Sequence, residues 1–190
     1  MKTKDEIRRM IRVKRAGLTL EWIDTHSKAA IERLRESDVL KGAVNLACYL
    51  AKPFEIQTQR FIESCLMEGK RVCVPRHIDD QEGYAWSWVS PAGAWRDGPW
   101  HIAEPAQFDP ADTNAIELAI VPAVAVDRAG QRVGHGGGNF DRLLAGITCT
   151  RVALVFDFQV IEEVPTESHD VPINVIVTEN ETYTIQAKPV

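Results

Sequence analysis

The sequence contains no apolar run long enough to cross a membrane. Its longest apolar stretches, such as AIVPAVAV at 119–126, have the length of a β-strand, whereas a membrane-spanning helix needs about 20 apolar residues. The N-terminus, MKTKDEIRRM, also lacks the apolar segment of a secretory signal. These two absences predict a cytoplasmic protein with no membrane partner.

Cysteine pairs and zinc-ligand patterns are missing as well. The four cysteines, Cys48, Cys65, Cys73 and Cys149, are scattered and form no CxxC pair. The five histidines lack the spacing of zinc ligands. We therefore expect buried, reduced thiols rather than a disulfide framework or a zinc centre.

The chain has no excess of positive charge. Its formal net charge is −5, which argues against a nucleic-acid partner. Basic residues are nevertheless concentrated at the start, where Lys2 to Arg15 contains seven Lys or Arg and two acids, whereas 152–187 contains no Lys or Arg. This asymmetry fits either a solvated helix face or a cationic helix that meets an anionic small molecule.

What is present is a succession of helical and strand patterns. Thr3 and Glu6 form a capping box that starts a helix with Lys4, Arg8 and Arg15 on one face. Further helices are expected at 20–35, from a cap at Thr58 through Glu68 to a stop at Gly69, and at 140–145. Strands are expected at 43–50, 71–75, 84–89, 117–126, 151–157 and 174–179.

Most of these strands are continuously apolar, which is typical of strands covered on both faces, and only 84–89 alternates like a half-exposed strand. The segment that follows, up to Pro110, is rich in Pro, Gly and Trp and predicts an irregular loop. The pattern predicts one domain, 1–190, built as a three-layer α/β/α sandwich around a mostly parallel, Rossmann-like sheet.

The glycine-rich stretch RVGHGGGNFDR, at 132–142, is the strongest local signal of a site. Its spacing matches neither the G-x-G-x-x-G nor the Walker A motif, and it fits a simple flexible turn. Glycines also let several backbone N–H groups converge on an anion, beside the charge of Arg132. Asp141 would repel a phosphate unless a divalent cation such as Mg²⁺ bridged the two. We interpret the loop as a nucleotide phosphate site.

The order of several motifs resembles the 5-formyltetrahydrofolate cyclo-ligase family, also called 5,10-methenyltetrahydrofolate synthetase. The family run P-[GL]-x-A-F-D-x-x-G-x-R-L-G-x-G-x-G-[YF]-Y-D-R stands here as VPAVAVDRAGQRVGHGGGNFDR, at 121–142. The shorter motifs that also match are Lys4 with Arg8, EIQT at 55–58, GKRVCVP at 69–75, IAEP at 102–105 and HDVPINVIVTE at 169–179. The resemblance covers nearly the whole chain and implies a fold of the NagB/RpiA/CoA-transferase-like type.

The resemblance implies ATP- and Mg²⁺-dependent cyclisation of 5-formyltetrahydrofolate to 5,10-methenyltetrahydrofolate by a monomer whose partners are these small molecules. Arg132 and Asp141 would be the catalytic residues, and Asp141 and Asp170 the magnesium ligands. The residues implied to bind ATP are Lys4, Arg8, Arg132, Gly134, His135, Gly136, Gly137, Gly138, Asn139 and Phe140. Those implied to bind the folate are Leu50, Glu55, Trp100, Gly136, Gly138 and Asn139. Arg15 matches no family motif and receives no role.

Asn139 departs from the family pattern, since the family has an aromatic residue at this position. The departure motivates the first of two alternatives to the cyclo-ligase that remain open, whereas the second would be motivated by loss of the cationic or metal-binding positions, and none of these is lost. One is a related enzyme with the same ATP and magnesium site and a different acceptor, and the other is a non-catalytic folate- or nucleotide-binding module. Leu50 and Trp100 fit plain packing as well as contact with the folate.

Overall fold

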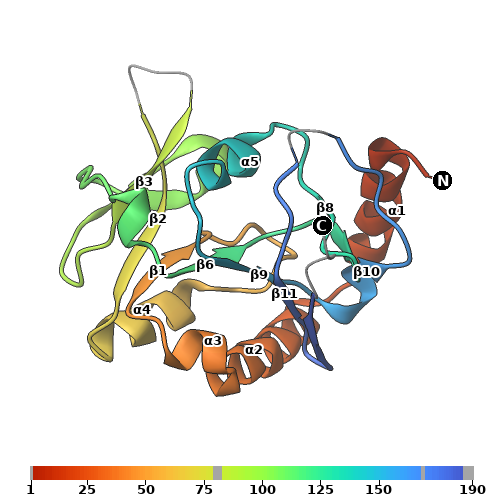
Figure 1. Ribbon diagram of the computed structural model, residues 1–190, viewed down its shortest axis with the longest axis horizontal. Helices are drawn as coiled ribbons and strands as arrows, with labels where there is room; N and C mark the ends of the chain where they lie inside the picture. The colour runs from red at the N-terminus through yellow and green to blue at the C-terminus, as the bar shows by residue number, and fades with distance from the viewer. Residues whose placement is uncertain (1, 79–82, 168–169, 186–190) are drawn as a thin grey trace.

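A computed structural model of the chain describes residues 2–78, 83–167 and 170–185 and has a seven-stranded sheet at its centre (Figure 1). The strands lie in the order β12-β11-β9-β6-β1-β2-β3. Their bounds are Thr182–Thr184, Val175–Val177, Thr150–Leu154, Leu118–Val121, Asn45–Cys48, Arg71–His77 and Tyr84–Trp88. The five inner strands are parallel, and each edge strand is antiparallel to its neighbour.

Helices cover both faces of this sheet, which confirms the three-layer α/β arrangement (Figure 1). α2 (Leu20–Glu36), α3 (Asp38–Lys41) and α4 (Gln59–Met67) lie on one face, and α5 (Asn139–Leu144) lies on the other. Within β1, Leu46 and Cys48 pack toward the first layer and Ala47 toward the second. Such burial of alternate residues on opposite faces explains why the strand sequences are continuously apolar.

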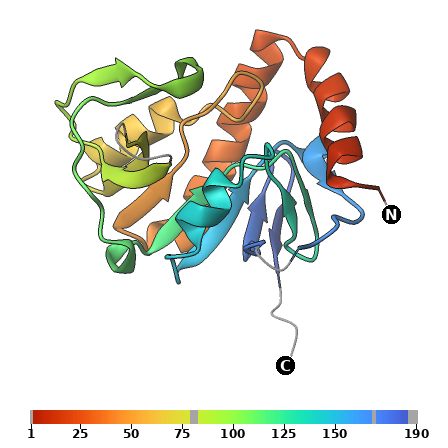
Figure 2. The same cartoon turned by 90° about the horizontal axis from the view of Figure 1, so that it is seen from above.

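A smaller sheet carries the glycine loop and holds the first helix. It contains β10 (Val160–Ile161), β7 (Ala125–Asp127) and β8 (Arg132–Val133), in that order. α1 (Lys4–Ala16) starts at the predicted capping box and packs Ile7 and Ile11 against this sheet. Figure 2 shows α1 at one end of the molecule, beside the strands that lead into the glycine loop. The helix with the cationic face is therefore anchored next to the loop.

Three of the expected elements are corrected by the structure. The strand expected at 117–126 is broken at Pro122, because β6 and β7 belong to different sheets. β3 is not half-exposed, since Trp86, Ser87 and Trp88 are all buried. Thr58 stands at the start of α4 but does not cap it, because its hydroxyl donates to the Tyr49 carbonyl at 2.7 Å.

The segment expected to be an irregular loop contains a short antiparallel ribbon of β4 (Trp95–Asp97) and β5 (Ala103–Pro105). Three 3-10 turns also occur, η1 (Pro99–His101), η2 (Thr113–Ala115) and η3 (Asp157–Gln159).

All four cysteines are free, and burial raises the pKa of the Cys73 thiol to about 12. The expectation of buried thiols is confirmed for Cys48, Cys65 and Cys73, whereas Cys149 is only half-buried. Within the described residues, no helix is long and apolar enough to span a bilayer.

The order of the strands creates a position suited to a ligand. Along the chain, β1 is followed by α4 and then by β2, which lies beside β1 in the sheet. β6 lies on the other side of β1 and is followed by β9, which lies one strand farther from β1. The connections therefore diverge between β1 and β6. In open α/β sheets, ligands bind beyond the carboxyl ends of the strands at such a point.

Ile11 tests how firmly α1 is anchored. Its side chain is 0% exposed, so Ile11→Ala should lower the free energy of unfolding by about 2–4 kcal/mol through lost burial and the cavity left behind. Val13→Ala is a matched control on the same helix, because Val13 is 75% exposed. Urea unfolding followed by circular dichroism measures both variants, and equal stabilities would contradict the packing of α1 on the small sheet.

Candidate active site

A cavity of about 220 Å³ lies where the connections diverge. It brings together the residues expected at the site from four separate parts of the chain, which are Lys4, Arg8, Leu50, Glu55, Arg132, Gly134, His135, Gly136, Gly137, Gly138, Asn139, Phe140, Asp141 and Asp170. Trp100 lies in η1, and its side chain is outside the described part of the structure. Its neighbours Pro99 and Ile102 do line the cavity.

The glycine loop presents backbone donors to this cavity. Gly136 and Gly138 have φ values of 107° and 64°, which side chains with a Cβ rarely adopt. Among the residues that the structure describes, no acceptor takes a hydrogen bond from the N–H groups of 134–138. The loop is exposed at 135–137, so these donors can meet a ligand. α5 has only six residues, and we therefore assign the anion-binding capacity to the loop and its cations rather than to a helix dipole.

An ion pair joins the two ends of the loop. Arg132 Nη2 donates to Asp141 Oδ1 at 2.5 Å, and the arginine side chain is only 2% exposed. Burial lowers the pKa of Arg132, while the charges of Asp141 and Asp170 act in the opposite direction. Arg132 Nε has no acceptor within the described structure. The Arg132 guanidinium thus has one N–H donor, at Nε, that no described residue accepts from.

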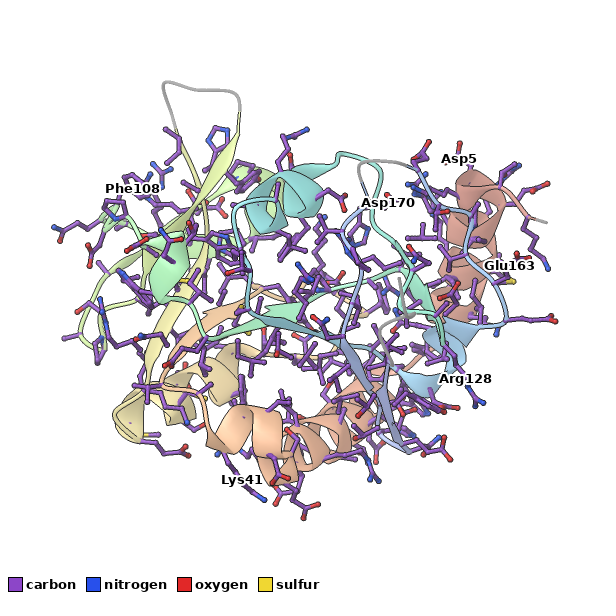
Figure 3. All side chains as sticks on the ribbon, viewed as in Figure 1. Asp5, Lys41, Phe108, Arg128, Glu163 and Asp170 are labelled. Carbon is purple, nitrogen blue, oxygen red and sulfur yellow. The ribbon has the colours of Figure 1, made fainter. Side chains whose placement is uncertain are left out.

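Asp170 lies close to the same centre and is held by α1. Lys4 Nζ is 2.7 Å from Asp170 Oδ2 and 2.6 Å from Glu167 Oε2. In Figure 3, Asp170 lies between α5 and α1. Burial lowers the pKa of Lys4, but its two carboxylate neighbours outweigh this effect, and the net direction is upward. The lysine is therefore firmly protonated and paired. Glu167 was not expected at the site, because no pattern in the sequence distinguishes it from other loop acids.

Arg8 reaches the loop from the next turn of α1. Its Nε donates to the Gly134 carbonyl at 2.9 Å, and its Nη1 donates to Asp5 Oδ1 at 2.5 Å. A Cβ at Gly136 would lie 3.5 Å from the Arg8 guanidinium carbon. The guanidinium therefore lies directly against the glycine loop.

Glu55 provides the polar group at another wall of the cavity. His135 Nε2 lies 2.7 Å from Glu55 Oε1, and the Lys52 N–H donates to Glu55 Oε2 at 2.8 Å. The carboxylate is buried, so these contacts fix its orientation. Glu55 and His135 were each expected at the site, but their pairing across 80 positions was not.

Three further residues complete the wall. Leu50 packs partly against the core and also lines the cavity. Phe140 packs edge-to-face on Trp86, with ring centroids 6.1 Å apart. Asn139, where the family has an aromatic ring, accepts a hydrogen bond from Arg142 through its side-chain oxygen. The Asn139 side chain is thereby held by another residue of α5, the helix that it begins.

Two carboxylates are available for a metal ion. The described residues contain no group of three or more His, Cys, Asp or Glu arranged to hold one. Magnesium, however, commonly takes one or two carboxylates together with phosphate oxygens and water. Asp141 and Asp170 both act on the buried Arg132 charge, and they lie beside a loop with free N–H donors. This donor set fits a magnesium ion that is bound together with a nucleotide.

Comparisons with known proteins address the family to which the chain belongs. The sequence model described as the 5-formyltetrahydrofolate cyclo-ligase family matches residues 1–179. The chain is 31% identical over 176 residues to the Escherichia coli K12 5-formyltetrahydrofolate cyclo-ligase, covering 89% of this chain and 96% of that protein.

Two solved structures have a similar fold. The Aquifex aeolicus 5,10-methenyltetrahydrofolate synthetase superposes with a TM-score of 0.86 at 26% identity, covering 98% of this chain and 95% of that one. The Mycoplasma pneumoniae 5,10-methenyltetrahydrofolate synthetase has a TM-score of 0.73 at 18% identity, covering 93% and 98%, and supports the fold alone. From the family match and these relatives we conclude that the chain belongs to the 5-formyltetrahydrofolate cyclo-ligase family of enzymes.

Proposed function

We propose that this protein uses ATP and Mg²⁺ to cyclise 5-formyltetrahydrofolate to 5,10-methenyltetrahydrofolate, with release of ADP and phosphate. The observation that carries the proposal is the glycine loop, whose N–H donors have no partner among the described residues, placed in one cavity with Lys4, Arg8 and Arg132 and with Asp141 and Asp170. Such a site can hold the triphosphate of ATP and still leave a wall for a second substrate.

The chemistry needs positioning and charge neutralisation rather than a side-chain nucleophile. The formyl oxygen attacks the γ-phosphorus and displaces ADP, which forms an imino phosphate. N10 of the folate then bonds to the formyl carbon and loses its proton, while the carbon–oxygen bond breaks and phosphate leaves with that oxygen. Arg132 and the loop N–H groups would stabilise the negative charge on the transferred group throughout.

The existing ion pairs suggest how the cavity accommodates ATP. Lys4 and Arg132 are paired with Asp170 and Asp141, so neither charge is buried alone before ATP binds. Phosphate oxygens can replace these carboxylates as partners of the two cations. Asp141 and Asp170 would then hold the magnesium ion, which supplies further charge neutralisation at the phosphates.

The folate would occupy the wall formed by Glu55 and Leu50. The buried carboxylate of Glu55 can accept N–H donors of the pterin ring, because a carboxylate has more acceptor sites than its two present partners use. Leu50 would pack against the ring. Asn139 lacks the ring that the family pattern places here, and Phe140, Pro99 and Ile102 provide the remaining apolar surface.

The first test is the reaction itself. The purified protein is mixed with ATP, Mg²⁺ and 5-formyltetrahydrofolate, and we expect the near-ultraviolet absorbance of methenyltetrahydrofolate to appear only when all components are present. Arg132→Met combined with Asp141→Asn is the control, because it removes both charges and leaves no buried ion unpaired. This double variant should lose about a hundredfold or more in kcat.

The outcome separates the proposal from its alternatives. Retained ATP binding without any absorbance change would contradict the cyclo-ligase and favour an enzyme with a different acceptor. ATP binding that is unaffected by the double substitution would place the nucleotide elsewhere, contrary to the proposed site.

Lys4→Ala tests the contribution of α1 to nucleotide binding. Loss of a charge-assisted contact to phosphate should raise the KM for ATP about tenfold and change the KM for the folate much less. Arg9→Ala on the same helix is the control, because Arg9 does not line the cavity. Steady-state kinetics in both substrates measures the effect, and an unchanged response to ATP would mean that Lys4 serves only to hold Glu167 and Asp170.

Glu55→Gln tests the folate wall. Glutamine keeps an oxygen acceptor for the Lys52 N–H and an amide for His135, so the local fold should persist. We expect about a tenfold weaker affinity for the folate, since the charge that favours the pterin N–H groups is lost, and little change for ATP. Titration calorimetry with each ligand measures this, and a selective loss of ATP binding would refute the assignment.

A further inference from the structure

A second hollow, of about 460 Å³, lies beside the active-site cavity along the C-terminal half of α1. Arg8 and His135 line both spaces, so the two adjoin. The residues found only in the second hollow are basic or apolar, and among its described lining residues there is no aspartate or glutamate. The hollow therefore has the charge of a site for an anion.

Arg15 is a partly buried cation in this hollow that forms no ion pair with the described residues. Its Nη2 donates to the Ala123 carbonyl at 3.3 Å, and its Nε is buried without an acceptor. No carboxylate within the described chain forms an ion pair with it. Burial lowers the pKa of Arg15, although the charge of Glu55 opposes this effect. A desolvated guanidinium is usually paired, as Arg132 is with Asp141, and the missing partner of Arg15 points to a ligand.

The length of α1 argues that this ligand group is not the nucleotide phosphate. Lys4 and Arg15 are eleven positions apart, which corresponds to about 16 Å along a helix. The glycine loop meets the helix at Arg8, so a triphosphate bound there would use the end that carries Lys4. Arg12 and Arg15 lie beyond it, and they are left for a second anion.

The remaining wall of the hollow suits an aromatic group. Phe54 lines it, is 39% exposed and has a φ of 67°, and Pro53 and Ala16 add apolar surface. Glu55, which follows Phe54 directly, is bound to His135 at the border between the two spaces. A ligand held by Glu55 could therefore extend past His135 into the hollow.

We propose that the hollow binds the p-aminobenzoylglutamate end of the folate, with its carboxylates at Arg12 and Arg15 and its aromatic ring against Phe54. The inference rests on the proposed function for the identity of the substrate. Of the two substrates, only the folate has an aromatic group linked to carboxylates, whereas the adenosine part of ATP is uncharged. Arg15 thus becomes a residue that selects folates bearing a glutamate.

The test compares 5-formyltetrahydrofolate with 5-formyltetrahydropteroate, the same molecule without its glutamate, by titration calorimetry. The wild-type protein should bind the glutamate-bearing compound at least about tenfold more tightly. Arg15→Met should remove most of this preference while leaving the affinity for the pteroate and for ATP unchanged. Arg12→Met, at an exposed position, should reduce the preference partly without risk to the fold.

Arg9→Met is the matched control, since Arg9 lies on the same helix and lines neither space. Equal affinities of the wild-type protein for the two compounds, or an Arg15→Met effect of equal size on both, would overturn the proposal. A loss of ATP affinity in Arg15→Met would also overturn it, because the hollow would then serve the nucleotide. These measurements need no turnover, so failure of the cyclisation assay and failure of this inference are separate results.

Discussion

The ion pair between Arg132 and Asp141 is the interaction on which the site depends. Arg132 lies in β8 of the small sheet and Asp141 lies in the first turn of α5, so their contact at 2.5 Å holds together the two ends of the glycine loop. A buried guanidinium without this partner would be costly in a medium of low dielectric constant. Because the pair closes the loop from outside, the backbone N–H groups of 134–138 are not needed for internal hydrogen bonds and stay available to a ligand.

Other charged side chains of the cavity are also paired with groups of the protein. Lys4 is paired with Asp170 and Glu167, and Glu55 is held by His135 and a backbone donor. Each of these charges is thus compensated within the protein, and apart from the Lys52 N–H that holds Glu55 the partners are side chains. Arg15 departs from this rule, because it is partly buried and forms no ion pair with the described residues. That difference is why we assign it to a ligand group rather than to the framework.

Two features of the fold bring these charges together. The divergence of connections between β1 and β6 opens a space at the ends of the central strands, where Leu50 and Glu55 follow β1. The small sheet then carries the glycine loop to this space and holds α1 through Ile7 and Ile11. Both sheets thus contribute to the meeting of α1, the glycine loop and Asp170.

The sequence by itself determined the local elements and the main motif. The capping box at Thr3, the buried strands and the glycine-rich loop all depend on residues a few positions apart, and the family pattern identified fourteen residues that line one cavity. Only the tertiary structure decided that Pro122 separates two sheets, that Trp86 to Trp88 of β3 are buried, that Glu55 pairs with His135, and that Arg15 has no carboxylate partner among the described residues. These features depend on contacts between segments up to 166 positions apart, and no periodicity within a single segment encodes how distant segments pack.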